Sequence, residues 1–245
     1  QGSYIDTGRV TLRDALSGVK GNKPFMRLAG GVFAFWLAGG VFNALVLFMV
    51  QHTLQLPTSS FLWFVFSQYI ASIVMLPLAV KLGNRIGKHR ALVFGSLAFM
   101  GLAPLFLLVS PGDFQGALMI FIAMGAVTSF IWVMPPALVA DAVEFGMISG
   151  GADDPAIYMS VYYFMQKMAM AAGVGLALPL AGVMGFDPMI SNSPAGLWGL
   201  NFSCLILPLV LALPGAVLLF NYPIDERRHL IVRRWLSRRT DSKML

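Results

Sequence analysis

Six long apolar segments constrain this chain more than any other feature of its sequence. They cover approximately residues 28–50, 61–80, 91–109, 114–140, 156–184 and 197–220. Each is long enough to cross the ~30 Å hydrocarbon core of a bilayer as a helix, which takes ~20 residues. Open sheets cannot span a bilayer, and the sequence lacks the ~10-residue alternating segments of an outer-membrane barrel. The sequence therefore predicts an all-α integral membrane protein with six transmembrane helices.

The composition excludes several other classes of protein. Of the 245 residues, 58% are hydrophobic and 11% are charged, whereas a soluble domain carries about 25% charged residues. The net charge of +6 belongs to a membrane pattern and not to a nucleic-acid-binding surface. Cys204 is the single cysteine, so no disulfide can form within the chain.

The basic residues predict the orientation in the membrane. All but one of the 17 Lys and Arg residues fall in three segments, which are 1–27, 81–90 and 221–245. Because positively charged loops stay in the cytoplasm, both termini and the loop 81–90 are expected there, in a plasma (inner) membrane. We expect 1–27 to be an amphipathic linker, 28–220 a six-helix bundle and 221–245 a basic tail. The loop 141–155 must also be cytoplasmic, although it has no Lys or Arg.

The remaining basic residue, Lys167, lies within the fifth apolar segment. Eleven residues separate it from Ala156, which places it ~16 Å above the cytoplasmic edge. A lysine at that depth costs ~3 kcal/mol or more, so it requires a polar cavity or a partner. Tyr163 shares its helix face, and Gln166 borders that face. Without the lysine, these residues would be ordinary packing or lipid-facing positions.

Two features of the fourth apolar segment accompany Lys167. Trp132 lies at a similar depth, ~13 Å above the cytoplasmic end, where it either lines a cavity or packs against neighbouring helices. Asp141 and Glu144 are three residues apart and share one helix face at the cytoplasmic mouth. They form either a solvated helix end or a gate whose basic partner comes from another segment.

Enzyme signatures are missing from the sequence. His52, His89 and His229 lie outside the apolar segments, so no metal site or histidine base is expected within the membrane. The sequence contains neither a nucleophile elbow nor a phosphate-binding loop. We therefore expect no enzyme, no metal site and no cofactor, while composition alone does not exclude an uncoupled pore.

Several motifs together resemble a known family. The residues GNRIGKHR at 83–90 resemble the short basic loop of the major facilitator superfamily, in its second-half copy. The residues ADAVEFG at 140–146 resemble the D-x-x-D-Y-G segment of the glycoside–pentoside–hexuronide:cation symporters, the melibiose-carrier-like group. The pair Gln166-Lys167, the residues GFDP at 185–188 and YPIDE at 222–226 also fit, and lipid-transporting animal relatives have a similar YPIDE ending. The resemblance covers nearly the whole chain as the C-terminal half, helices seven to twelve, of a twelve-helix bundle.

The resemblance implies roles for individual residues. It places Trp132 and Lys167 in a substrate-binding cavity with Tyr163, and Gln166 is included because it borders the same face. It also assigns the cytoplasmic gate to three charged residues, Asp141, Glu144 and Arg85. After Gly146 the sequence departs from the family pattern, which leaves the basic partner of the gate acids open.

The implied function is half of a secondary active transporter that carries a sugar or glycoside with a cation by alternating access. The coupling ion would be Na⁺ or H⁺, held mainly by an N-terminal six-helix half, which would be the main partner besides the lipid bilayer and a small-molecule solute. Two alternatives remain. The same fold could carry a lipid-like or other organic solute, or the chain could be a non-transporting remnant or scaffold.

Overall fold

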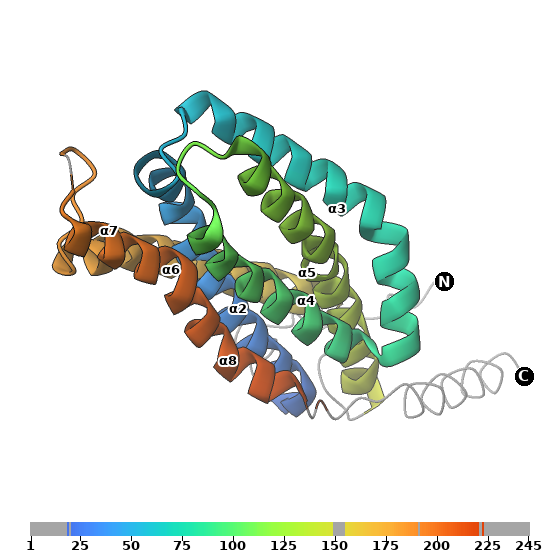
Figure 1. Cartoon of the computed structure of the whole chain (residues 1–245). Helices are drawn as coiled ribbons and strands as arrows, with labels where there is room; N and C mark the ends of the chain where they lie inside the picture. The colour runs from blue at the N-terminus through green and yellow to red at the C-terminus, as the bar shows by residue number, and fades with distance from the viewer. Residues whose placement is uncertain (1–18, 20, 149–154, 191, 221, 223–245) are drawn as a thin grey trace, which may run out of the picture.

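The structure is a computed structural model that describes residues 19, 21–148, 155–190, 192–220 and 222, and these residues form a bundle of helices (Figure 1). The helices are α2 (Lys23–Phe48), α3 (Thr58–Ile86), α4 (Lys88–Leu102), α5 (Phe114–Ile148), α6 (Pro155–Val183), α7 (Pro194–Asn201) and α8 (Leu207–Phe220). Short turns of π- or 3₁₀-helix extend them at Met49–Thr53, Ala103–Leu108 and Phe202–Ile206. The predicted segments 1–27 and 221–245 lie mostly outside the described residues.

Six continuous helical stretches in the described residues are long and apolar enough to cross a membrane. They are Lys23–Thr53, Thr58–Ile86, Lys88–Leu108, Phe114–Gly146, Pro155–Val183 and Pro194–Phe220. This confirms the predicted all-α class with six membrane-spanning helices. Several helices extend beyond the apolar segments into polar residues, because only the part within the hydrocarbon core must be apolar.

The helices pack around α2, which contacts α6 and α8, while α3 packs on α5 and α4 packs between α5 and α8 (Figure 1). Glycines make the contact between α2 and α6 close. A Cβ atom on Gly40 would lie 2.5 Å from the carbonyl oxygen of Met170, and one on Gly173 would collide with the carbonyl oxygen of Leu37. Small residues at such positions let membrane helices approach backbone to backbone. This contact fixes α6, and with it Lys167, against the centre of the bundle.

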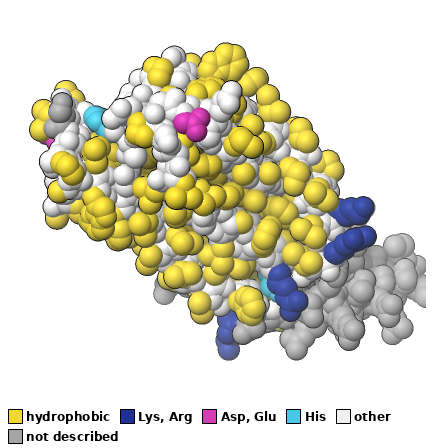
Figure 2. All heavy atoms as spheres, viewed as in Figure 1, with side chains coloured by type: hydrophobic (Ala, Val, Ile, Leu, Met, Phe, Trp, Pro, Cys, Tyr) yellow, Lys and Arg dark blue, Asp and Glu magenta, His cyan; other side chains and the backbone are white. Residues whose placement is uncertain are grey.

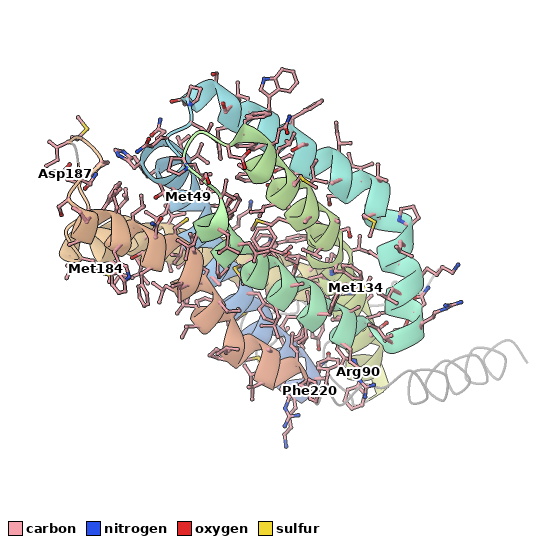
Figure 3. All side chains as sticks on the ribbon, in the orientation of Figure 1. Met49, Arg90, Met134, Met184, Asp187 and Phe220 are labelled. Atoms are coloured by element: carbon pink, nitrogen blue, oxygen red, sulfur yellow. The ribbon has the colours of Figure 1, made fainter. Side chains whose placement is uncertain are left out.

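The two ends of the bundle differ in charge. Hydrophobic side chains cover most of the face shown in Figure 2, and the Lys and Arg side chains visible there gather at one end. Figure 3 shows Arg90 and Phe220 at this end, while Met184 and Asp187 lie at the opposite end. We call the end that carries the loop 81–90 the basic end. A protein surface that is apolar around its middle and charged at an end is typical of an integral membrane protein.

Candidate functional site

A cavity of about 320 Å³ opens between α2, α3, α4, α5 and α6. Three of the four residues predicted to bind substrate line it: Trp132 from α5, and Gln166 and Lys167 from α6. Two helices that are consecutive in the sequence thus bring an indole ring, an amide and an ammonium group to one cavity. Ligand sites are concave and mostly apolar with a few converging polar groups, and this cavity has that character.

The exposure of the lining residues gives the cavity a mouth and a floor. At the mouth, Trp132 is 48% exposed and Lys167 is also exposed. At the floor, Phe42 and Phe99 are buried and their rings meet edge to face, with centroids 5.4 Å apart. A charged group beside an indole ring at the mouth, with further aromatic rings at the floor, suits a ligand that has both hydroxyl groups and apolar C–H faces.

Trp132 is held by a second tryptophan. The ring of Trp36 on α2 meets it edge to face, with centroids 5.5 Å apart, and Trp36 also lines the cavity. An edge-to-face contact of this kind restrains the ring orientation. We did not predict Trp36 as a site residue, because a tryptophan in an apolar segment gives no signal that distinguishes a cavity from packing.

Tyr163 does not line this cavity. It lies one helical turn from Lys167, is 49% exposed, and its ring contacts that of Tyr162 with centroids 5.0 Å apart. The four-residue spacing puts Tyr163 on the same side of α6 as Lys167, but Tyr163 is not among the lining residues. Its role in substrate binding stays a prediction.

The predicted gate acid Asp141 forms an ion pair with Lys88. The lysine Nζ lies 2.7 Å and 2.8 Å from the two carboxylate oxygens, with the side chains 32% and 11% exposed. Glu144 lies about one turn further along α5 and is partly buried. The basic partner that the sequence left open is therefore Lys88 for Asp141.

Arg85 takes a different position from Lys88. Helix α3 ends at Ile86, and Gly87 has a φ angle of +95°, a conformation that favours glycine. The chain turns there, so that Lys88 begins α4 and reaches α5. Arg85 remains in the last turn of α3 and is exposed, where a cation is favourable at a helix C-terminus. Its assignment to the gate stays a prediction.

Tyr222 lies against His89 at the basic end. It is 5% exposed, and its ring lies 5.9 Å from that of the buried His89. Burial raises the pKa of the Tyr222 phenol, and the negative charge of Asp141 raises it further. The phenol is therefore neutral near pH 7.

Sequence comparison identifies the family to which this chain belongs. The sequence profile described as "MFS/sugar transport protein", where MFS is the major facilitator superfamily, matches residues 4–226. The chain belongs to this family. The match confirms the predicted resemblance to the glycoside–pentoside–hexuronide symporter-like proteins, and six membrane-spanning helices fit one half of a major-facilitator bundle.

Three relatives illustrate how similar this chain is to other proteins. An uncharacterized symporter of Synechocystis sp. is 24% identical over 224 residues, which is 89% of this chain and 41% of that protein. The glucuronide carrier protein homolog of Escherichia coli is 25% identical, over 89% of this chain and 48% of that protein. A putative sulfoquinovose importer of E. coli is 30% identical over 122 residues, 48% of this chain and 25% of that protein. The chain thus spans half or less of the length of these relatives, which bear the names of transport proteins.

A polar cluster around Asn22 was not predicted from the sequence. Asn22 caps α2 by accepting a hydrogen bond from the backbone N–H of Phe25 at 3.0 Å. Its Nδ2 atom donates to the carbonyl oxygen of Ala142 on α5 at 2.8 Å and to the Tyr158 hydroxyl on α6 at 3.4 Å. Asn followed by Lys-Pro before an apolar run is a helix-start signal that sequence reading could have found. The long-range contacts carry no such signal.

A metal site does not emerge from the parts of the chain that are described. Among those residues, no three His, Cys, Asp or Glu side chains come close enough to hold an ion. Through the described residues that line it, the cavity offers hydrogen bonding, aromatic contact and the positive charge of Lys167.

Proposed function

We propose that this chain is the C-terminal six-helix half of a secondary active transporter that carries a sugar or glycoside together with a cation. The observation that supports this most is the cavity, because it joins Trp132, Gln166 and Lys167 among helices that span the membrane. Membership of the MFS/sugar transport protein family agrees with this proposal.

The chemistry of the lining suits a sugar. The Trp132 ring offers an apolar face to the C–H groups of a sugar ring. The amide of Gln166 hydrogen-bonds hydroxyl groups, and the ammonium of Lys167 hydrogen-bonds hydroxyl or acid groups. Placing an ionisable residue within the membrane costs free energy, and such residues are usually functional. The names glucuronide carrier and sulfoquinovose importer of two relatives support a sugar-like solute.

The exposed residues at the cavity mouth support the proposal that a second half of the transporter completes the binding site. In carriers of this type the solute lies between two repeats, and one repeat rocks against the other to alternate access. The exposed Lys167 and Trp132 face the position that an N-terminal half would occupy. That half would hold most of the site for the coupling ion, Na⁺ or H⁺. The ion pair between Lys88 and Asp141 would stabilise the gate at the cytoplasmic side.

Reconstitution into proteoliposomes tests the half-carrier proposal. The chain together with its N-terminal half should take up sugar when a Na⁺ or H⁺ gradient is applied, and the chain alone should not. Robust ion-driven uptake by the chain alone would refute the half-carrier proposal. If the assembled carrier takes up no sugar under either gradient, sugar symport is wrong.

The proposed orientation has its own test. We place the basic end and both termini in the cytoplasm of a plasma (inner) membrane, because loops with Lys and Arg stay inside. In a Cys204→Ser background, a cysteine at the exposed Ser59 should react with an impermeant reagent from outside, and one at the exposed Arg85 should not. Outside labelling at position 85 would reverse the orientation.

A further inference from the structure

Two buried oxygen atoms at the floor of the cavity have no hydrogen-bond partner among the described residues. They are the hydroxyl oxygen of Ser96 on α4 and the side-chain oxygen of Gln166 on α6. Ser96 is 1% exposed and Gln166 is 8% exposed, and both residues line the cavity. A buried polar atom without a partner is destabilising, so its presence in a membrane bundle calls for an explanation.

Ser96 differs from other hydroxyl residues of the same bundle. The hydroxyls of Thr128 and Ser129 on α5 donate to the carbonyl oxygens of Met124 and Ala126, both at 2.7 Å. A serine or threonine in a helix usually satisfies its hydroxyl in this way, on the preceding turn of its own helix. The Ser96 hydroxyl makes no such bond to its own helix, and because Ser96 lines the cavity, its hydroxyl is available to a group that enters there.

The surroundings of these two oxygens restrict what can enter. Phe42, Phe99, Met100 and Phe121 line the same cavity and are each at most 7% exposed. A carboxylate or sulfonate would lose its hydration among these side chains and would meet the Gln166 oxygen, which accepts hydrogen bonds and repels an anion. A neutral hydroxyl group can donate to Gln166, can exchange a hydrogen bond with Ser96, and leaves the adjoining C–H groups against the aromatic rings.

We propose that Ser96 and Gln166 form an inner subsite that hydrogen-bonds neutral hydroxyl groups of the solute, and that Ser96 determines specificity there. This rests on the proposed function, in which the cavity holds a sugar. The solute then has a fixed direction. Its uncharged hydroxyl-bearing end points to the floor between α4 and α6, and any charged group stays at the mouth beside Lys167.

Deoxy sugars test this subsite in the carrier assembled from both halves. A transported sugar and its monodeoxy analogues are compared as substrates of the wild type, of Ser96→Ala and of Ser129→Ala. One analogue, which lacks the hydroxyl that reaches Ser96, should have a KM about 3- to 10-fold above that of the parent sugar in the wild type. Ser96→Ala should raise the KM of the parent sugar by a similar factor and should leave the KM of that analogue unchanged. Ser129→Ala, which removes a buried hydroxyl outside the cavity, should change none of these values.

The stability of the variant separates binding from a structural role. Ser96→Ala should unfold at the same temperature as the wild type or higher, because it removes a buried hydroxyl without a partner. A lower unfolding temperature, or a KM equal to that of the wild type for the parent sugar and all analogues, would overturn the inner subsite while sugar uptake persists. If the wild-type carrier transports no sugar, the proposed function fails and the subsite fails with it.

Discussion

The basic end and the cavity lie on the same two helices, but their charged side chains differ in whether they are paired. At the basic end, Asp141 on α5 is paired with Lys88, and Tyr158 on α6 accepts a hydrogen bond from Asn22. The Tyr222 hydroxyl is an exception there, since it has no hydrogen-bond partner among the described residues. About two turns or more deeper along these helices, Lys167 has no ion-pair or hydrogen-bond partner within the described part of the chain, and the Ser96 hydroxyl on neighbouring α4 has none either.

This difference separates stability from binding. A polar group that is paired within its own chain holds helices together and has little left to offer a ligand. A polar group kept at membrane depth without a partner costs free energy, so it is expected to meet something from outside the chain. The predictions below test whether the two regions are as distinct as their hydrogen bonding indicates.

The largest effect is expected for Lys167→Leu. Coupled uptake by the assembled carrier should fall by more than about 100-fold, since the only charge among the described residues of the cavity lining would be lost. Membrane insertion should persist, because removing a charge from a spanning helix makes insertion easier. The matched control is Lys81→Leu, which removes an exposed lysine at the basic end. Normal uptake by Lys167→Leu would show that the lysine is not part of the site.

Trp132→Ala should weaken solute binding by ~1–3 kcal/mol, which is the range found for the stacking of bases on aromatic rings. The KM for a transported sugar should rise accordingly, about 5- to 150-fold. Trp198→Ala serves as the control, because Trp198 is also exposed but stacks on Phe202 outside the cavity. Equal effects of the two substitutions would remove the distinction between a site tryptophan and a surface tryptophan.

Lys88→Met should act mainly on stability. The substitution removes the charge that pairs with the partly buried Asp141 carboxylate. The free energy of unfolding should fall by about 1–2 kcal/mol, between the values for exposed and buried pairs. Thermal unfolding in detergent measures this. The variant Lys88→Met/Asp141→Leu should lose less stability than the two single substitutions combined. Strict additivity would mean that the two charges do not interact.

The fold could be predicted from the sequence, because the apolar length of each segment alone determines that it spans the membrane. Counting residues along their helices places Lys167 and Trp132 at similar depths, whereas their assignment to one cavity comes from the family resemblance. Lys88 could not be chosen over Arg85, since the choice depends on the turn at Gly87 and on how α4 lies against α5. Ser96 could not be predicted as a site residue, because a serine on an apolar helix is usually explained by packing. Only the structure shows that its hydroxyl lacks a partner among the described residues.

The smallest effect is expected for Tyr158→Phe. This change removes only the hydroxyl that accepts from Asn22 at 3.4 Å, which is a long and weak hydrogen bond. The stronger bond from Asn22 to Ala142 at 2.8 Å remains, and so does the edge-to-face contact of the ring with Phe25 at 5.0 Å. The free energy of unfolding should therefore fall by about 0.5 kcal/mol or less, and the KM for the solute should not change, because Tyr158 does not line the cavity. A rise in KM comparable to that of Trp132→Ala would show that the basic end takes part in solute binding, and the division between the two regions would then be wrong.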